Sequence, residues 1–228
     1  MFQANEEQKD KWHEQRWAKF TASSNYRLLG SGKPGELFGQ TAWSYIQEKA
    51  IQECTHKWER PQLEFVESLL HGSMYEYPAF KEYVIRTGYD MIYLGTEHPL
   101  FLDDEQLMGH SGGSPDTIAM NNNHEITRMA EIKCPKNPMN HFQRLKWKDQ
   151  WDIKEKYIEA YCQIQNLLKI SNSPYCDFVS FDERMKSDKL KMKIITVYPD
   201  KKFQDNLHFR LVKAIEEKKR IVEDIMTF

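Results

Sequence analysis

The chain has 228 residues, with 32 lysines and arginines against 34 aspartates and glutamates, so its formal net charge is −2. This length supports one well-filled core and is short for two ordinary domains, so we expect a single domain over residues 1–228. The balanced charge excludes a protein that is basic as a whole, and any nucleic-acid surface must be a local patch.

Segments with helical spacing of apolar residues alternate with strand-like runs, which predicts an α/β fold. The predicted helices span residues 5–17, 25–29, 41–53, 61–87, 157–170 and 200–228. The predicted strands span residues 91–94, part of 101–108, 117–120, 126–133, 175–181 and 189–198. Pro61 opens the fourth helix, which we expect to break or kink near Gly72 and Pro78. Asp200 caps the last helix.

Some polar positions have an ordinary structural interpretation. Ser23 and Ser24 are candidate caps of the second helix, Gly88 is a candidate C-terminal cap, and Glu76 fits an exposed helix acid. Basic and aromatic residues alternate over 136–156, which suits a surface that touches phosphates and bases. An amphipathic helix over a core has the same pattern, so both interpretations stay open.

The cysteines and the apolar runs bear on location. Cys54, Cys134, Cys162 and Cys176 lack the spacing of zinc or iron–sulfur ligands, so we expect free thiols in a reducing compartment. No apolar stretch approaches membrane length and the N-terminus has no exporting run. We therefore expect an intracellular, cytoplasmic protein that does not contact a membrane.

The stretch from Gly112 to Pro135 predicts a β-hairpin. One arm spans 117–120, a polar turn follows at 121–124, and the second arm spans 126–133. Asparagines between apolar runs favour this interpretation, because asparagine tolerates the left-handed backbone of a tight turn.

The hairpin brings two acids and a lysine together. Strand side chains alternate, so Glu131 and Lys133 face the same side, and pairing places Asp116 level with them. This set suits a hard divalent cation beside an activated water. The acid-any-Lys pattern alone is weak, because it recurs at Asp152–Lys154 and Glu216–Lys218, where surface salt bridges suffice. From the hairpin alone, a buried structural ion pair remains the alternative.

Six motifs occur in an order that resembles one family. They are Trp12-His13-x-x-Arg16 leading to Thr21-Ala22-Ser23, Gly72-x-x-Tyr75-Glu76, Ser114-Pro115-Asp116, Glu131-Ile132-Lys133-Cys134-Pro135, Gln163-Ile164-Gln165 and Asp182-x-Arg184-Met185-Lys186. Over nearly its whole length the chain resembles the phage lambda-type alkaline exonucleases, also called YqaJ-like viral recombinases, of the PD-(D/E)xK nuclease superfamily. One departure is Thr117, where the family often has glycine.

The resemblance implies a restriction-endonuclease-like core, with a mixed central β-sheet flanked by helices. It also implies roles for named residues. Asp116, Glu131 and the main-chain carbonyl of Ile132 would bind two catalytic Mg²⁺ ions, for which Mn²⁺ could substitute, and Glu76 would help. Lys133 would hold the attacking water and help to deprotonate it.

The resemblance assigns further residues around that centre. Gln163 would orient the water or the scissile phosphate. Arg16, Ser23 and Ser114 match the positions that bind the 5′-terminal phosphate. An arginine fork with two hydroxyls is chemically well suited to that task.

The implied activity is a Mg²⁺-dependent 5′→3′ exonuclease that degrades one strand of linear double-stranded DNA to mononucleotides. The 3′ single-stranded tail left behind would serve recombination, with a ring-shaped homotrimer and a single-strand annealing protein as partners. The alternatives are a structure-specific endonuclease of the same superfamily and a non-catalytic DNA-binding relative. An end pocket argues against the first, and the complete set of acids and lysine argues against the second.

Overall fold

The computed structural model describes residues 6–55, 67–95 and 100–227. The helices are α1 (Glu6–Arg16), η1 (Asn25–Leu28), α2 (Gln40–Glu53), α3 (Glu67–Thr87), η3 (Glu105–Leu107), α4 (Pro138–Arg144), α5 (Gln150–Lys156), α6 (Ile158–Ser171), α7 (Asp188–Lys191) and α8 (Lys201–Met226). The strands are β1 (Phe20–Thr21), β2 (Ile92–Tyr93), β3 (Leu102–Asp103), β4 (Ser111–Gly113), β5 (Thr117–Met120), β6 (Ile126–Lys133), β7 (Cys176–Phe181) and β8 (Met192–Val197).

The predicted hairpin lies in the middle of a five-stranded sheet with the order β2-β5-β6-β7-β8. β6 and β7 run parallel, and the other neighbouring strands run antiparallel. A smaller sheet, β1-β4-β3, joins the N-terminal segment to the chain that leads into the hairpin. The mixed central sheet with flanking helices confirms the predicted fold class.

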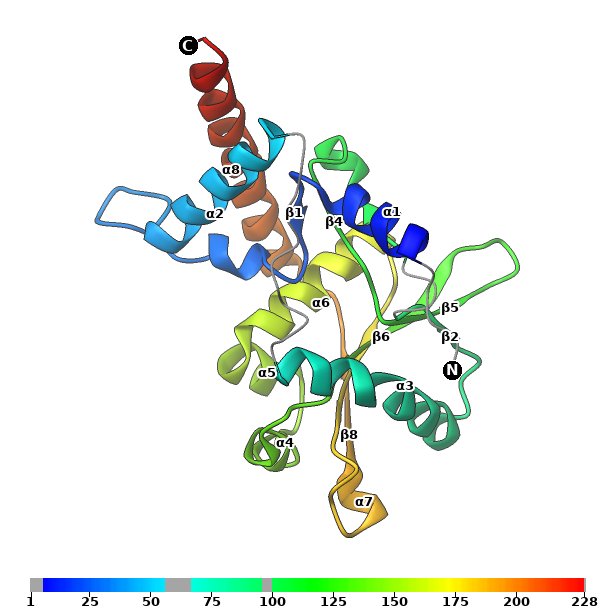
Figure 1. Cartoon of the computed structure of the whole chain (residues 1–228). Coiled ribbons are helices and arrows are strands. Elements are labelled where there is room, and N and C mark those ends of the chain that lie inside the picture. The colour runs from blue at the N-terminus through cyan, green and yellow to red at the C-terminus, as the bar shows by residue number, and fades with distance from the viewer. Residues whose placement is uncertain (1–5, 56–66, 96–99, 228) are drawn as a thin grey trace.

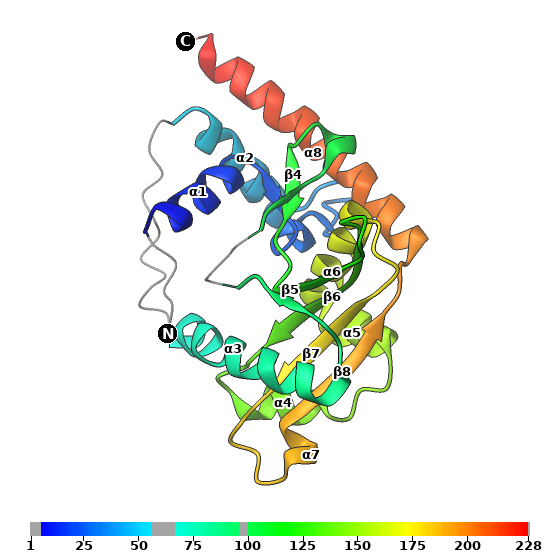
Figure 2. The ribbon, with the colours of Figure 1, turned by 90° about the vertical axis from the view of Figure 1, so that its right-hand side faces the viewer.

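Successive side chains of β6 point to opposite faces of the sheet, and each face packs against a separate hydrophobic core. Met129 belongs to a large core that includes residues of α6 and α8, whereas Ala130 and Ile132 face a smaller core under α3. Figures 1 and 2 show α3 across one face of the sheet and α5 and α6 on the other. Glu131 and Lys133 have the same parity as Met129, so they point to the α6 side.

The hairpin arms have the predicted bounds, but the turn is built differently from the prediction. The turn residue with a left-handed backbone is His124, at φ 62°, rather than an asparagine. Asn121 contributes through its side chain, whose Oδ1 accepts hydrogen bonds from the backbone N–H groups of Asn123 and Glu125. The short polar side chain closes the turn in the manner of an Asx-turn.

Predictions about helix ends had mixed outcomes. The side chain of Asp200 caps α8 by accepting from the Phe203 N–H, as predicted, and Gly88 ends α3 with a φ of 69°. Ser24 begins η1 without a side-chain hydrogen bond, so its predicted capping role is wrong. Of the predicted break or kink in α3, a break is excluded, because the helix continues through Gly72 and Pro78. Its predicted start at Pro61 lies outside the described residues.

The four cysteines are free thiols, as predicted. Within the described ranges, no helix is both long enough and apolar enough to cross a membrane.

Candidate active site

The end of β6 and the start of β5 bring the three predicted hairpin residues together. The backbone N–H of Ile132 donates to Asp116 Oδ2 at 2.7 Å, which holds this carboxylate beside β6. The backbone N–H of Leu94 donates to the Asp116 carbonyl at 2.9 Å, so the residue that follows β2 anchors Asp116. Lys133 Nζ lies 2.5 Å from Glu131 Oε1. The predicted convergence of two acids and a lysine is therefore present.

Glu131 is the most enclosed of these groups. It is 1% exposed, and its second oxygen, Oε2, is buried without a hydrogen-bond partner in the described part of the chain. A buried unpaired carboxylate oxygen is costly, and native structures rarely keep one unless another ligand satisfies it. The chemistry of this oxygen fits a cation ligand better than a structural ion pair.

The electrostatics of the cluster point the same way. Burial raises the pKa of Asp116 well above its usual range, and the negative charges of Glu131 and Glu76 raise it further. Burial lowers the pKa of Lys133, but Glu131 and Asp116 raise it more, so the net shift is upward. The site therefore holds more negative charge than one lysine offsets, as a divalent-cation site does.

Two further predicted residues reach the cluster from helices. Glu76 on α3 accepts a 2.9 Å hydrogen bond from the Tyr93 hydroxyl, and burial raises its pKa, with Glu131 adding to the shift. Gln163 on α6 accepts from Lys133 Nζ at 3.3 Å. Glu76 thus stands beside the acids, and Gln163 orients the lysine.

The described carboxylates do not by themselves form a complete set of ligands around one metal ion. Among the described residues, no three His, Cys, Asp or Glu side chains are spaced as ligands of one ion, and Lys133 occupies one oxygen of Glu131. The donor set that fits is smaller: Asp116, the free oxygen of Glu131 and the adjacent carbonyl of Ile132. Glu76 points to Tyr93 instead.

One cavity of about 380 Å³ unites the cluster with the predicted phosphate residues. Arg16, Ser23 and Ser114 line it together with Asp116, Glu131, Lys133, Glu76 and Gln163. Ile132 is the exception among the predicted residues, and it lines an adjoining cavity. Arginine and two hydroxyls therefore lie in the same hollow as the acids, although they come from segments far apart in the sequence.

The decisive comparison is with protein families. The sequence profile of the YqaJ-like viral recombinase domain matches residues 11–174, which is more than half of the chain. The chain belongs to the YqaJ-like viral recombinase family. No curated protein shows a significant match to it.

Solved structures share the fold of this YqaJ-family chain. An alkaline exonuclease, LHK-Exo from Laribacter hongkongensis, is similar with 22% identity, 96% coverage of both chains and a TM-score of 0.77. LHK-Exo in complex with dAMP matches with 23% identity, 95% coverage of both chains and a TM-score of 0.75. A phage-related exonuclease from Haemophilus somnus 129PT matches with 14% identity, 91% coverage of this chain, 96% of that chain and a TM-score of 0.64.

The YqaJ-family site includes supporting residues that sequence reasoning missed. Trp12 on α1 donates from Nε1 to Ser114 Oγ at 3.0 Å, and the Arg16 guanidinium lies 4.1 Å from the centre of the Trp12 ring. Trp12 therefore orients Ser114 and Arg16, two of the candidate phosphate-binding residues. Its place in the Trp-His-x-x-Arg motif was the one signal available.

Gly95 and Thr117 also support the YqaJ-family site. A Cβ at Gly95 would collide with the Tyr93 hydroxyl and with the Glu76 carboxylate, so a larger residue here would displace the ends of these two side chains. Thr117 is buried, and its hydroxyl donates to the Ile92 carbonyl at 2.7 Å. The departure from glycine at 117 therefore ties β5 to β2 and removes nothing from the site.

Proposed function

We propose that this protein is a Mg²⁺-dependent 5′→3′ exonuclease that removes mononucleotides from one strand of linear double-stranded DNA. The observation that carries the proposal is the shared cavity. In it, the Asp116–Glu131–Lys133 cluster opens onto the same space as Arg16 and two serine hydroxyls. A cation site beside a phosphate pocket suits hydrolysis of a phosphodiester close to a strand end.

Each residue of the chain has a defined task in this proposal. Asp116, Glu131 and the Ile132 carbonyl hold the cation, with Glu76 behind them. When bound, Mg²⁺ neutralises charge on the phosphate and lowers the pKa of a nearby water. Lys133, which pairs with Glu131, holds that water and helps to deprotonate it, as the resemblance implies. Gln163 fixes the direction of the ammonium.

The end pocket supports the 5′→3′ direction of the proposed digestion. Burial lowers the pKa of Arg16, but a guanidinium stays charged at any physiological pH. With Ser23 and Ser114 it offers several donors in one place, which suits a terminal phosphate that carries more charge than a diester. A pocket for a terminal 5′-phosphate favours an exonuclease over the structure-specific endonuclease.

Relatives support the product and suggest the assembly. A mononucleotide, dAMP, was crystallised with LHK-Exo, which is consistent with mononucleotide release here. From the family resemblance we further propose a homotrimer that encircles the duplex and acts with a single-strand annealing protein. The trimer and the annealing protein rest on the family resemblance alone.

The test is digestion of a linear blunt duplex labelled separately at its 5′ and 3′ ends, with Mg²⁺ or EDTA and with 5′-phosphate or 5′-hydroxyl ends. We expect early release of mononucleotides from the phosphorylated 5′ end, in Mg²⁺ only. Asp205→Asn is a matched control for acid substitutions, because Asp205 is exposed on α8 and pairs with Lys201.

The other outcomes identify the rivals. Internal cuts, or indifference to the end group, would assign the site to an endonuclease. Absence of cleavage with Mg²⁺ and with Mn²⁺ would favour the non-catalytic DNA-binding relative.

A further inference from the structure

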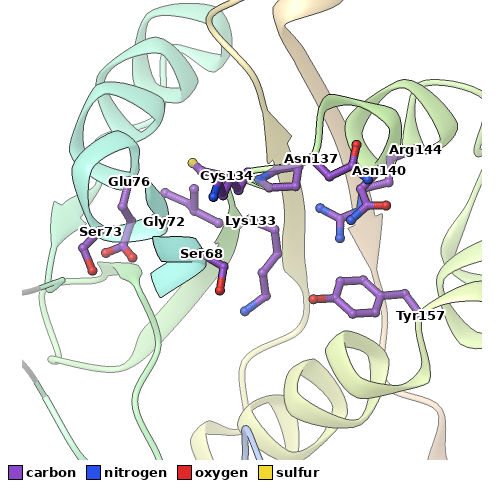
Figure 3. Close-up of a pocket in the computed structure, with 13 residues that line it drawn as sticks. Ser68, Gly72, Ser73, Glu76, Lys133, Cys134, Asn137, Asn140, Arg144 and Tyr157 are labelled. Carbon is purple, nitrogen blue, oxygen red and sulfur yellow. The ribbon is translucent and has the colours of Figure 1, made fainter. Parts of the chain in front are cut away.

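A second cavity adjoins the first and has no role in the mechanism above. Its volume is about 710 Å³, and Glu76 and Lys133 line both cavities. α3 forms one wall, whereas Asn140 and Arg144 of α4 and Tyr157, just before α6, form the opposite wall (Figure 3). The two cavities therefore meet at the catalytic lysine.

Arg144 is the unusual residue of this cavity. It is only 6% exposed, yet the described part of the chain gives it no ion pair. Its hydrogen bond from Nη1 to Ser180 Oγ is long at 3.5 Å, and its other side-chain hydrogen bond is to Tyr157. Burial lowers the pKa of Arg144, and the groups that offset this effect are Tyr157 and Cys134, neither of which is a carboxylate.

Two other arginines of the fold have more polar partners, although the Nε of Arg210 is buried without one among the described residues. Arg210 is similarly buried, and its guanidinium donates to the Leu28 carbonyl, the Leu37 carbonyl and Ser31 Oγ. Arg128 forms a 2.6 Å ion pair with Asp177. Among the described residues Arg144 has no ion pair, and its side chain lines the cavity.

Aromatic rings hold Arg144 in place. Its Cζ lies 4.6 Å from the centre of the Tyr157 ring and 5.7 Å from that of Phe178. Cation–π contacts of this kind offset part of the cost of burial and fix the plane of the guanidinium. A guanidinium with five N–H donors can still bind a further acceptor beside Ser180 and Tyr157, and the ligands that suit its planar fork best are phosphates and carboxylates.

The position of the cavity favours a phosphate of the DNA substrate, rather than a carboxylate, as the ligand of Arg144. The end pocket lies in the first cavity and Lys133 at the junction, so a strand that enters the end pocket continues past the lysine into the second cavity. Tyr157 lies close enough to both cations to raise the pKa of Lys133 and of Arg144. Figure 3 shows the Lys133 amine and the Tyr157 hydroxyl on the side of the cavity below Arg144.

We propose that Arg144, together with the Tyr157 hydroxyl, binds the phosphodiester that follows the scissile one on its 3′ side. This inference rests on the proposed exonuclease function and adds a subsite to it. Arg144 binds the substrate but takes no part in proton transfer. Its contact fixes the second phosphate, which aligns the scissile bond at Lys133.

The test compares Arg144→Met with substrate analogues. The probe is a 5′-phosphorylated duplex in which a neutral methylphosphonate replaces the phosphate between the second and third nucleotides. In single-turnover release of the first nucleotide, we expect the analogue to slow the wild-type protein by about 10–100-fold, the range for a hydrogen bond to a charged group. On ordinary DNA, the release rate of Arg144→Met should fall below that of the wild type by a similar factor. Replacing the phosphate by the methylphosphonate should then lower the rate of Arg144→Met no further.

Matched variants separate binding from folding. Arg144→Lys keeps the positive charge but lacks the two-pronged guanidinium. We expect its rate to lie between those of the wild type and Arg144→Met, and its thermal unfolding temperature to equal that of the wild type. Arg220→Met removes an arginine that is exposed on α8 and pairs with Glu217, and it should retain the full sensitivity to the analogue. A methylphosphonate far along the same strand should affect no variant.

Two results would overturn the subsite. One is that the losses from Arg144→Met and from the analogue multiply, which would leave Arg144 as a packing residue for Tyr157. The other comes from binding of the duplex in EDTA, which does not require cleavage. One lost phosphate contact should reduce the slope of log affinity against log salt by about 0.7–0.9, and an unchanged slope in Arg144→Met would remove the contact. If the wild type binds DNA without cleaving it, the exonuclease proposal fails while the slope still decides the subsite.

Discussion

Asp116→Asn tests whether the acidic cluster is built for a cation. Asparagine has the same shape and can still accept the hydrogen bond from the Ile132 N–H, so the local fold should survive. The substitution removes one of three neighbouring carboxylates. Since burial and its acidic neighbours raise the pKa of Asp116, its charged form costs stability in the metal-free protein. We therefore expect Asp116→Asn to unfold at a higher temperature than the wild type in EDTA.

Mg²⁺ should stabilise the wild type much more than Asp116→Asn. A ligand at one hundred times its dissociation constant stabilises the folded state by about 2.7 kcal/mol. In a chain of this length that corresponds to a rise of about 5–11 °C in the unfolding temperature. The wild type should show this rise, and Asp116→Asn should show little of it. Differential scanning fluorimetry in EDTA and in graded Mg²⁺ measures both effects.

The pH dependence provides a second check. A carboxyl with a raised folded pKa destabilises the protein most above that folded pKa; the penalty shrinks as the pH falls below the folded pKa and is gone below the unfolded pKa. The advantage of Asp116→Asn in EDTA should therefore shrink as the pH is lowered from neutrality. The control Asp205→Asn should retain the full Mg²⁺ response. An equal Mg²⁺ response in Asp116→Asn would refute the cation site.

Three further substitutions test other parts of the structure. Lys133→Ala should reduce Mg²⁺-dependent cleavage by at least about 10²–10³-fold, and near-wild-type rates would contradict its assignment. Arg16→Ala should lower the preference for 5′-phosphate over 5′-hydroxyl ends more than it lowers cleavage itself, whereas equal losses on both substrates would argue against the end pocket. Burial lowers the pKa of Lys49 from 10.5 to about 8, so its charge penalises folding below pH 8 and the penalty fades toward pH 10.5. Lys49→Met should stabilise the protein by about 1–3 kcal/mol near pH 7 and by less at pH 10, and chemical denaturation that finds no such trend would exclude this effect.

The part of the site that could be predicted from residues alone is the part that is local in sequence. Asp116, Glu131 and Lys133 belong to one hairpin, and the period of two along a strand is enough to place them on one side. Their proximity needed no knowledge of how helices pack. The interpretation of the hairpin erred only in the turn, where His124 takes the left-handed backbone and Asn121 acts through its side chain.

The remaining site residues are distant in sequence, and no local pattern connects them. Arg16, Glu76 and Gln163 come from α1, α3 and α6, and only family motifs suggested that they meet. The hydrogen bonds from Trp12 to Ser114 and from Tyr93 to Glu76 depend on how these helices and strands pack. Leu70 on α3 is apolar and yet 50% exposed, because tertiary packing rather than periodicity decides which part of a long helix is covered.

The Asp182-x-Arg184 motif had no role from sequence, and the structure explains it through the turn after β6. Arg184 donates to the carbonyls of Pro135 and Lys136 at 3.1 and 2.9 Å, while Asp182 holds its guanidinium at 2.7 Å. His141 on α4 lies within hydrogen-bonding distance of Ser180 Oγ and the Leu190 carbonyl. The chain that leaves Lys133 is therefore fixed to the β7–β8 connection, and α4 with it. Because Lys133 ends β6 and Arg144 ends α4, these contacts tie together the elements that carry the two cations of the adjoining cavities.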